Sequence, residues 1–212
     1  MKVAVIGGTG RMGKALAKQL SRNNKVIIGS RDAARAQAVA GGISGAVGMD
    51  YVGASTEADA ALFAIPYSAI GEASALKKEL SGKLAVSLIN PLKLEDGVLA
   101  YSLDKGSAAE ELAMLLPDSR ISTAFNHVSF LFFERDEVTP IDILVAADSR
   151  QTYEETAGLV KGIPNLRPLY AGPLSQARAV EEMTAMVLNL AKLNGTGSLT
   201  TKFVSTRDSA RH

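Results

Sequence analysis

The 212-residue chain contains no cysteine and two histidines, His127 and His212. Without a thiol it can form no disulfide, hold no iron–sulfur cluster and use no thiolate as a nucleophile. With so few histidines, one of them the last residue, a zinc site built on imidazole is not expected. We therefore predict no metal site.

Strong charge and long apolar runs are also lacking. The formal net charge of +1 gives no electrostatic reason to bind nucleic acid or an anionic membrane. No apolar run approaches the roughly 18–20 residues that cross a bilayer, and the chain enters a predicted strand without a signal-peptide pattern. The 47% hydrophobic and 21% charged residues are typical of a globular protein. We expect a cytoplasmic protein whose partners are small molecules.

A strand followed by a glycine-rich turn opens the chain. Residues 3–6 are apolar and partly β-branched, which is typical of a buried parallel strand. Gly8, Gly10 and Gly13 follow with the spacing G-x-G-x-x-G, and residues 14–21 continue as a helical pattern. This order predicts a dinucleotide-binding turn, with Gly8 in the tight turn, Gly10 beside a pyrophosphate and Gly13 where the helix meets the strand. The alternative is a turn that only redirects the chain.

The end of the second predicted strand, residues 26–31, indicates which dinucleotide binds. NAD-binding proteins usually carry there an acidic residue that binds the ribose 2′-hydroxyl. This chain has Ser30 and Arg31, with Arg35 one helical turn later. A hydroxyl and two guanidiniums favour a 2′-phosphate, whereas Asp32 is placed to cap the following helix. We predict NADP(H), against the alternative that both arginines are solvated surface charges.

Strands and helices alternate through the first ninety residues, which predicts an α/β, Rossmann-type doubly wound, mostly parallel sheet. We expect an NADP-binding domain at 1–148, a small C-terminal helical subdomain at 149–204 that completes a second pocket, and a frayed tail at 205–212. Further strands are predicted at 46–49, 60–65, 84–89, 120–125, 141–146 and 166–170, helices at 32–40, 68–80, 107–116, 149–161 and 174–193, and a charged turn at 134–137.

Two short stretches, Pro66-Tyr67 and Asn90-Pro91, directly follow predicted strands. Ligands of such sheets bind outside the carboxyl ends of the strands, so these residues are expected beside the cofactor. Tyr67 is expected against the ribose or the nicotinamide. The alternative for the prolines is that they only terminate strands.

Later stretches resemble the NADP-dependent coenzyme F420 oxidoreductase family, whose members pass a hydride between a deazaflavin and NADP. The resemblance spans nearly the whole chain up to Val204. It is carried by residues 165–169 and 171–175, the run 178–184, Leu188-Asn189, Asn194-Gly195, Gly197 and Lys202-Phe203, together with residues 7–10, Gly29-Ser30-Arg31 and Ile65-Pro66.

The resemblance implies which residues touch the two cofactors. Thr9, Gly10, Met12, Ser30, Arg31 and Arg35 would line the NADP phosphates, and Pro66 and Tyr67 would approach the nicotinamide. Arg178, Thr184 and the turn from Gly195 to Gly197 would lie near the deazaflavin. With the residues already derived, the predicted cofactor-binding set is completed by Gly8, Arg11, Ile65 and Asn90.

One stretch departs from the family pattern. The family histidine at the end of the sixth strand is replaced by Asn126, with His127 one residue later and Ser129 at the family proline. Phe130, Phe132 and Phe133 stand where small residues are expected, in a stretch that the resemblance implies is the wall of the second pocket. Asn126 and His127 are the candidate catalytic residues, and FMN or FAD remains open as the electron partner in place of F420.

Hydride transfer between two cofactors needs no nucleophile and no obligatory side-chain acid, which suits this sparse inventory. The alternatives are an NADPH-dependent flavin or ferric reductase, an imine or carbonyl reductase with His127, Tyr67 or Lys93 as proton donor, and a non-catalytic NADP(H) redox sensor. The apolar residues 128–133 could serve an interface, and we expect a homo-oligomer, a dimer.

Overall fold

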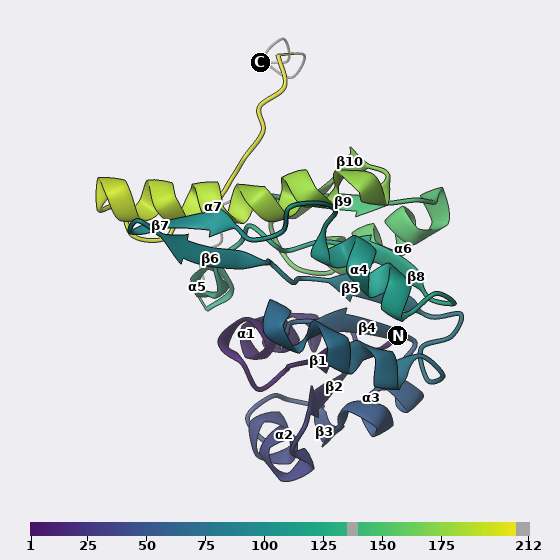
Figure 1. Cartoon of the computed structure of the whole chain (residues 1–212). Coiled ribbons are helices and arrows are strands. Elements are labelled where there is room, and N and C mark those ends of the chain that lie inside the picture. Colours follow the sequence, from purple (N-terminus) through teal and green to yellow (C-terminus); the bar gives the residue numbers. More distant parts are fainter. Residues whose placement is uncertain (135–139, 207–212) are drawn as a thin grey trace.

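The computed structural model describes residues 1–134 and 140–206. An eight-stranded sheet in the order β10-β9-β8-β5-β4-β1-β2-β3 runs through it (Figure 1). Six of its strands are parallel, which confirms the predicted doubly wound, mostly parallel sheet, and they follow the order 3-2-1-4-5-6 of dinucleotide-binding folds. They are β1 (Lys2–Ile6), β2 (Lys25–Ser30), β3 (Val47–Asp50), β4 (Ala60–Phe63), β5 (Leu84–Ser87) and β8 (Arg120–Thr123).

Two further strands extend the sheet in the opposite direction. β9 (Ile141–Ala147) is antiparallel to β8, and β10 (Leu166–Gly172) is parallel to β9. The start of β9 therefore lies at the edge where β8 ends. The boundary predicted between residues 148 and 149 falls between β9 and β10, which pair with each other in one sheet.

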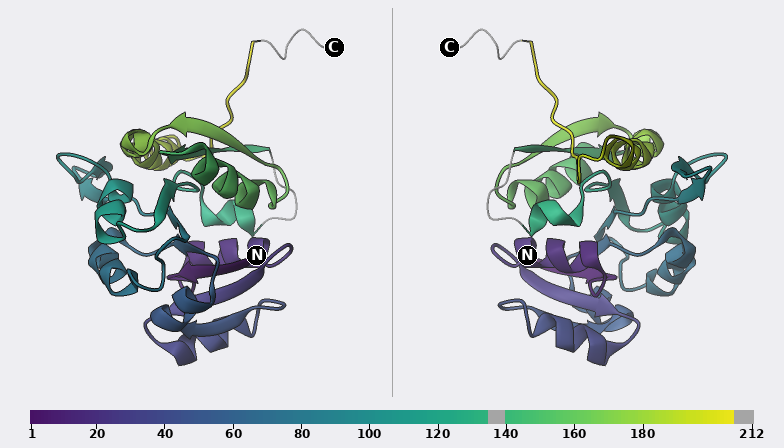
Figure 2. Two further views of the ribbon diagram at one scale, coloured as in Figure 1. Left: turned by 90° about the vertical axis from the view of Figure 1, so that its right-hand side faces the viewer. Right: turned by 90° about the vertical axis from the view of Figure 1, so that its left-hand side faces the viewer.

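Helices cover both faces of the sheet because alternate strand residues point to opposite sides (Figure 2). Val3 and Val5 belong to one apolar cluster, and Ala4 and Ile6 belong to the other. The first cluster is covered by α1 (Arg11–Leu20), α2 (Ala33–Ala40), α5 (Phe130–Phe133) and α6 (Arg150–Lys161). The second is covered by α3 (Tyr51–Glu57), the 3₁₀ segments η1 (Tyr67–Leu76) and η2 (Leu174–Gln176), α4 (Ala108–Leu115) and the start of α7 (Ala177–Asn194).

A small hairpin beside α7 was not predicted. β6 (Leu92–Glu95) pairs antiparallel with β7 (Val98–Tyr101), and Asp96 and Gly97 form the turn with φ of 47° and 84°. Asp-Gly between apolar residues is a strong hairpin signal, so the sequence did contain the information. The Asn189 side chain of α7 accepts from Leu99 N and donates to Leu99 O, both at 2.8 Å, and thereby joins the helix to the hairpin.

Several predicted elements have different ends. The first helix begins at Arg11 rather than at residue 14, and the helix predicted at 68–80 is the 3₁₀ segment η1. Residues 135–137 of the predicted charged turn and residues 207–212 of the predicted tail lie outside the described residues. Within residues 1–134 and 140–206, no helix has the length and apolar character needed to cross a membrane.

Candidate functional site

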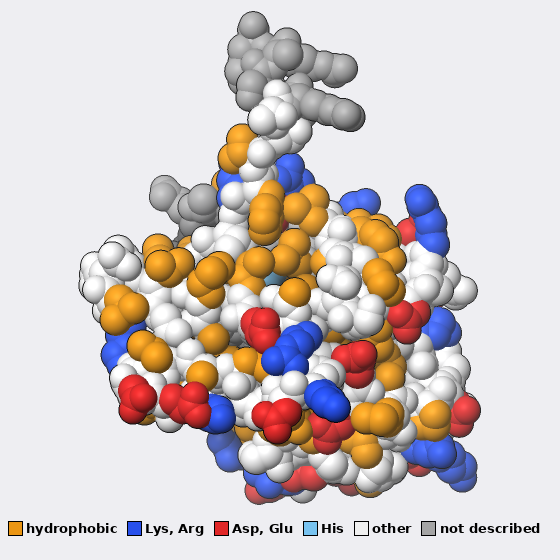
Figure 3. All heavy atoms as spheres, turned by 45° about the horizontal axis from the view of Figure 1, so that its top comes forward, with side chains coloured by type: hydrophobic (Ala, Val, Ile, Leu, Met, Phe, Trp, Pro, Cys, Tyr) orange, Lys and Arg blue, Asp and Glu red, His pale blue; other side chains and the backbone are white. Residues whose placement is uncertain are grey.

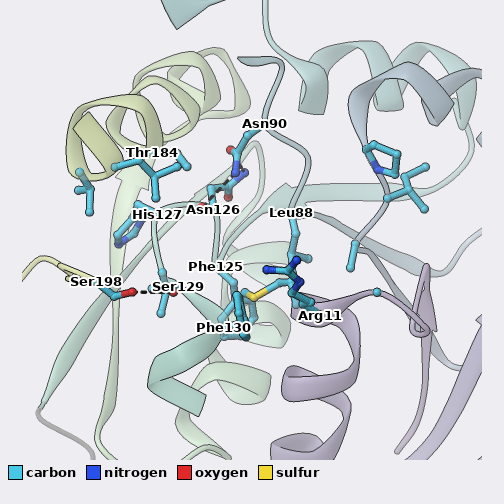
Figure 4. Close-up of a pocket in the computed structure, with 18 of the residues that line it drawn as sticks. Arg11, Leu88, Asn90, Phe125, Asn126, His127, Ser129, Phe130, Thr184 and Ser198 are labelled. Atoms are coloured by element: carbon cyan, nitrogen blue, oxygen red, sulfur yellow. Dashed lines mark hydrogen bonds between the residues drawn. The ribbon is translucent and has the colours of Figure 1, made fainter. Parts of the chain in front are cut away.

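A cavity of about 470 Å³ lies where the carboxyl ends of β1, β4, β5 and β8 meet α7 (Figure 4). Its volume is in the range of small-molecule pockets, roughly 300–1,000 Å³. The cavity brings together nine of the predicted site residues: Gly10, Arg11, Met12, Ile65, Pro66, Asn90, Asn126, His127 and Thr184.

The glycine turn after β1 forms one wall of the cavity. Gly7 has φ +83°, and a Cβ there would lie 2.5 Å from Ala64 O. Gly7 is thus the left-handed residue of the turn, and the predicted need for a glycine at Gly8 is confirmed, because a Cβ there would lie 2.8 Å from Val5 O. At Gly13 a Cβ would lie 2.6 Å from Gly7 O, which confirms the predicted close approach of helix and strand.

Helix α1 starts directly after Gly10, and neither a side-chain cap nor an acidic residue occupies its first turn. Its first backbone N–H groups are therefore available to an anion, with the helix dipole adding to the attraction. Gly8 and Thr9 lie in the turn but do not line the cavity.

The residues predicted to read the 2′-phosphate lie at the carboxyl end of β2, outside the cavity. Asp32 Oδ1 accepts from Ala34 N at 2.9 Å and from Arg35 N at 3.2 Å, which confirms that it caps α2. Ser30 is buried, and its hydroxyl accepts from Asp32 N at 3.3 Å. The Arg31 side chain is 76% exposed and lies 3.4 Å from the Glu72 carboxylate. The predicted phosphate contacts of Ser30, Arg31 and Arg35 remain predictions.

Tyr67 does not line the cavity, because its hydroxyl donates to Glu111 of α4 at 2.8 Å. The pKa of Tyr67 is raised, mainly by this hydrogen bond to Glu111. The phenol is therefore held as a neutral donor to a carboxylate, with its oxygen directed at α4.

Arg178, Gly195 and Gly197 also lie outside the cavity lining. The Arg178 guanidinium bonds Glu182 at 2.8 Å and Asp104 O at 3.0 Å and lies 4.9 Å from the Tyr101 ring centre. Gly195, with φ +62°, ends α7 in the left-handed conformation that favours glycine there. These contacts are structural, and the predicted role of the three residues toward the deazaflavin remains a prediction.

Asn126 joins the ends of β5 and β8. Its Nδ2 donates to Asn90 Oδ1 at 3.1 Å, and its backbone oxygen accepts from Asn90 Nδ2 at 3.0 Å. Its Oδ1 accepts from the Thr123 hydroxyl at 2.8 Å. Since this amide is 4% exposed and engaged on both sides, it positions the cavity wall and has no free proton to donate.

His127 and Thr184 are buried polar residues of the cavity with unused hydrogen-bonding capacity. His127 is 2% exposed, and Nε2 lies 2.9 Å from Asp142 O. Burial lowers the pKa of His127, because the charged ring would lose its hydration. His127 Nδ1 and Thr184 Oγ1 are buried without a hydrogen-bond partner among the described residues.

The rest of the lining is mostly apolar and, apart from Ser129 and Phe130, was not predicted. Phe125, buried with φ +63°, turns the chain at the end of β8. Phe130, which the resemblance placed in the wall of the second pocket, has its ring centre 5.7 Å from the Arg11 guanidinium. The remaining members are Ala64, Leu88, Val128, Ser129, Val187, Leu188, Ser198 and Leu199.

A buried carboxylate behind the cavity was also missed. Glu181 of α7 is fully buried and accepts from Tyr101 OH at 2.7 Å and from Ala108 N and Ala109 N, each at 3.0 Å. It thus occupies the N-terminus of α4, where a negative charge is favoured. Burial raises the pKa of Glu181 and is the larger effect, although these hydrogen bonds act to lower it. An acidic residue beside Val180 and Thr184 on a predicted buried helix face was the available signal.

Comparison with known proteins identifies the family of the chain. The family model described as "NADP oxidoreductase coenzyme F420-dependent" matches residues 2–91. An F420-dependent NADP reductase from Methanocaldococcus jannaschii is 32% identical, with 93% of this chain and 96% of that protein covered. An F420-dependent NADP reductase from Methanothermobacter thermautotrophicus is also 32% identical, with 90% and 89% covered.

A solved structure, described as a putative F420-dependent NADP-reductase from Arthrobacter sp. FB24, superimposes with a TM-score of 0.84 at 21% identity. It covers 97% of this chain and 100% of that chain, and it shows the shared fold. By the similarity of nearly its whole length to the two archaeal proteins, the chain belongs to the family of F420-dependent NADP reductases.

Proposed function

We propose that this protein transfers a hydride between NADP(H) and the deazaflavin coenzyme F420. The observation that carries the proposal is that one cavity has two different walls. One wall is the glycine turn with Ile65 and Pro66, and the other is the end of β8 with Thr184 of α7. Two ring systems held on these walls would meet face to face, which is the positioning that hydride transfer requires.

The first wall suits NADP. The open N-terminus of α1 offers backbone N–H groups to the pyrophosphate, while Ser30, Arg31 and Arg35 surround the place of the 2′-phosphate. The nicotinamide would lie against Ile65 and Pro66. When bound, F420 supplies or accepts the hydride, so the chain has to orient the rings and exclude water.

The second wall suits a largely apolar ring with a few polar atoms. Met12, Leu88 and Phe125 make the cavity apolar, and the unpartnered Thr184 hydroxyl is available to a ligand atom. Asn126 holds this wall together through its bonds to Asn90. A flavin remains the second candidate partner, since Phe130 adds an aromatic side chain where the family pattern has a small one.

The test is oxidation of NADPH by the purified protein with F420, FMN, FAD and a small imine or ketone offered separately. Turnover with F420 is expected, and NADH should be a poor substitute. Turnover with FMN or FAD alone would show that the electron partner is a flavin and not the deazaflavin. Turnover with the imine or ketone alone would show that the protein is a reductase of small substrates. Binding of NADPH without any turnover would support a redox sensor.

A homodimer in the cytoplasm belongs to the same proposal. Met186, Leu190 and Leu193 of α7 are 53%, 45% and 69% exposed and lie at helical spacing along one stripe. Figure 3 shows hydrophobic side chains gathered on the face that carries α7. This stripe supports a second copy as the occupant, and sedimentation of the wild type against Leu193→Glu would test it.

A further inference from the structure

The orientation of the His127 ring defines the role of each of its nitrogens. Nε2 lies 2.9 Å from the backbone oxygen of Asp142 at the start of β9. A carbonyl oxygen can only accept, so Nε2 carries the proton. In the neutral ring Nδ1 is then a hydrogen-bond acceptor.

The surroundings keep this ring neutral near pH 7. The ring is 2% exposed, and the pKa of His127 is lowered mainly by burial. The Asp142 carboxylate acts in the opposite direction, but it is already bound by Arg167 at 2.6 and 2.9 Å and by Phe203 N. His127 therefore enters the cavity wall as a neutral acceptor.

Nδ1 has no partner among the described residues, and a buried acceptor without a partner costs free energy. Because the two nitrogens of an imidazole point in diverging directions, the bond of Nε2 to β9 turns Nδ1 away from that strand. The Thr184 hydroxyl in the same lining is likewise unpartnered. Figure 4 shows His127 and Thr184 on the side of the cavity opposite Arg11 of the glycine turn.

We propose that His127 Nδ1 accepts a hydrogen bond from a ring N–H of the electron partner and so selects rings with a pyrimidinedione edge. This role rests on the proposed function, because the NADP wall lies across the cavity. A deazaflavin offers N3–H in both redox states and N1–H when it is reduced. The Asp142 carbonyl is the positioning group, since it fixes the tautomer.

Two variants separate the two nitrogens. In His127→Asn the terminal amide lies near the place of Nδ1 and keeps an acceptor for the ligand. In His127→Gln it lies near the place of Nε2 and keeps the bond to Asp142 O but loses that acceptor. Titration by F420 fluorescence should show about a tenfold or greater rise in Kd for His127→Gln and a change within about threefold for His127→Asn. The Kd for NADPH should stay at the wild-type value in both, which also verifies folding.

The role of His127 is overturned if His127→Gln binds F420 as the wild type does, or if the two variants lose affinity equally. If the wild type binds NADPH but not F420, the proposed function itself fails. A 3-methyl deazaflavin, together with anaerobic titration of the reduced ring, identifies the donor. If the difference between the variants disappears on methylation, N3–H is the donor; if it exists only with the reduced ring, N1–H is.

Discussion

At the scale of single residues, the choice between NADP and NAD depends on three side chains at the end of β2. Ser30 is buried, whereas Arg31, which directly follows β2, and Arg35, in the first turn of α2, are exposed. Two carboxylates lie next to them: Asp32 has its Oδ1 turned to the backbone of α2, and Glu72 lies 3.4 Å from the Arg31 guanidinium. The Arg31–Glu72 contact is a surface pair, so both guanidiniums remain within reach of a 2′-phosphate.

We predict that the double variant Arg31→Ala, Arg35→Ala raises the Kd for NADPH about tenfold to a hundredfold and leaves the Kd for NADH within about threefold. Each guanidinium supplies a charge-assisted hydrogen bond that only the 2′-phosphate can use. The measurement is titration of both nucleotides by fluorescence. Arg22→Ala, in the exposed turn after α1, is the control for loss of one positive charge. Equal loss of NADPH and NADH binding would contradict the prediction.

At the scale of elements, α7 is anchored to two others by Glu181. Its carboxylate receives the Tyr101 hydroxyl of β7 and the first N–H groups of α4. All three partners are donors, which is why a carboxylate fits this place and an amide does not. The anchor lies one helical turn before Thr184, so it also sets the position of the cavity wall.

Glu181→Gln should lower the free energy of unfolding by about 1–3 kcal/mol, because one amide N–H would face a donor in a buried place. Urea unfolding followed by circular dichroism measures this change. The adjacent Glu182→Gln is the matched control, since Glu182 is 45% exposed and its pair with Arg178 is a surface pair worth less than about 1 kcal/mol. Similar losses in both variants would show that Glu181 is not a special anchor.

At the scale of the whole molecule, stability depends on pH through buried groups. The pKa of His127 is lowered in the folded state. Below about pH 6.5 the unfolded chain therefore binds a proton at His127 that the folded chain does not bind. The stability from His127 is thus complete above that pH and is lost as the pH falls. Glu181 has the opposite sign, because its raised pKa makes the folded state the better proton acceptor as the solution is acidified.

We predict that the free energy of unfolding of the wild type, relative to His127→Asn, decreases between pH 7.5 and pH 5.5. The slope contributed by one group cannot exceed about 1.4 kcal/mol per pH unit. Urea unfolding of both proteins across this range measures the difference, and the subtraction removes the contribution of Glu181. Parallel pH profiles would mean that the pKa of His127 is the same in the folded and unfolded states, which would contradict the prediction.

The sequence by itself determined the features that depend on near neighbours. The strand, turn and helix around Gly10, the cap formed by Asp32 and the doubly wound order of strands all follow from local patterns and short connections. The Asp96-Gly97 hairpin was equally local, and its signal was overlooked. The family was predicted from the resemblance of the later stretches to known members, and the two archaeal relatives confirm that prediction.

Only the tertiary structure decided which side chains meet. Tyr101 and Glu181 are 80 residues apart in sequence, and no spacing predicts their bond. The reversed direction of β9 brings Asp142 O to His127 Nε2. This contact determines that Nδ1 is the nitrogen without a partner among the described residues, which the presence of a histidine in the sequence does not. Tyr67 and Arg178 have other partners for the same reason: long-range packing chooses among hydrogen-bond partners that the sequence leaves equivalent.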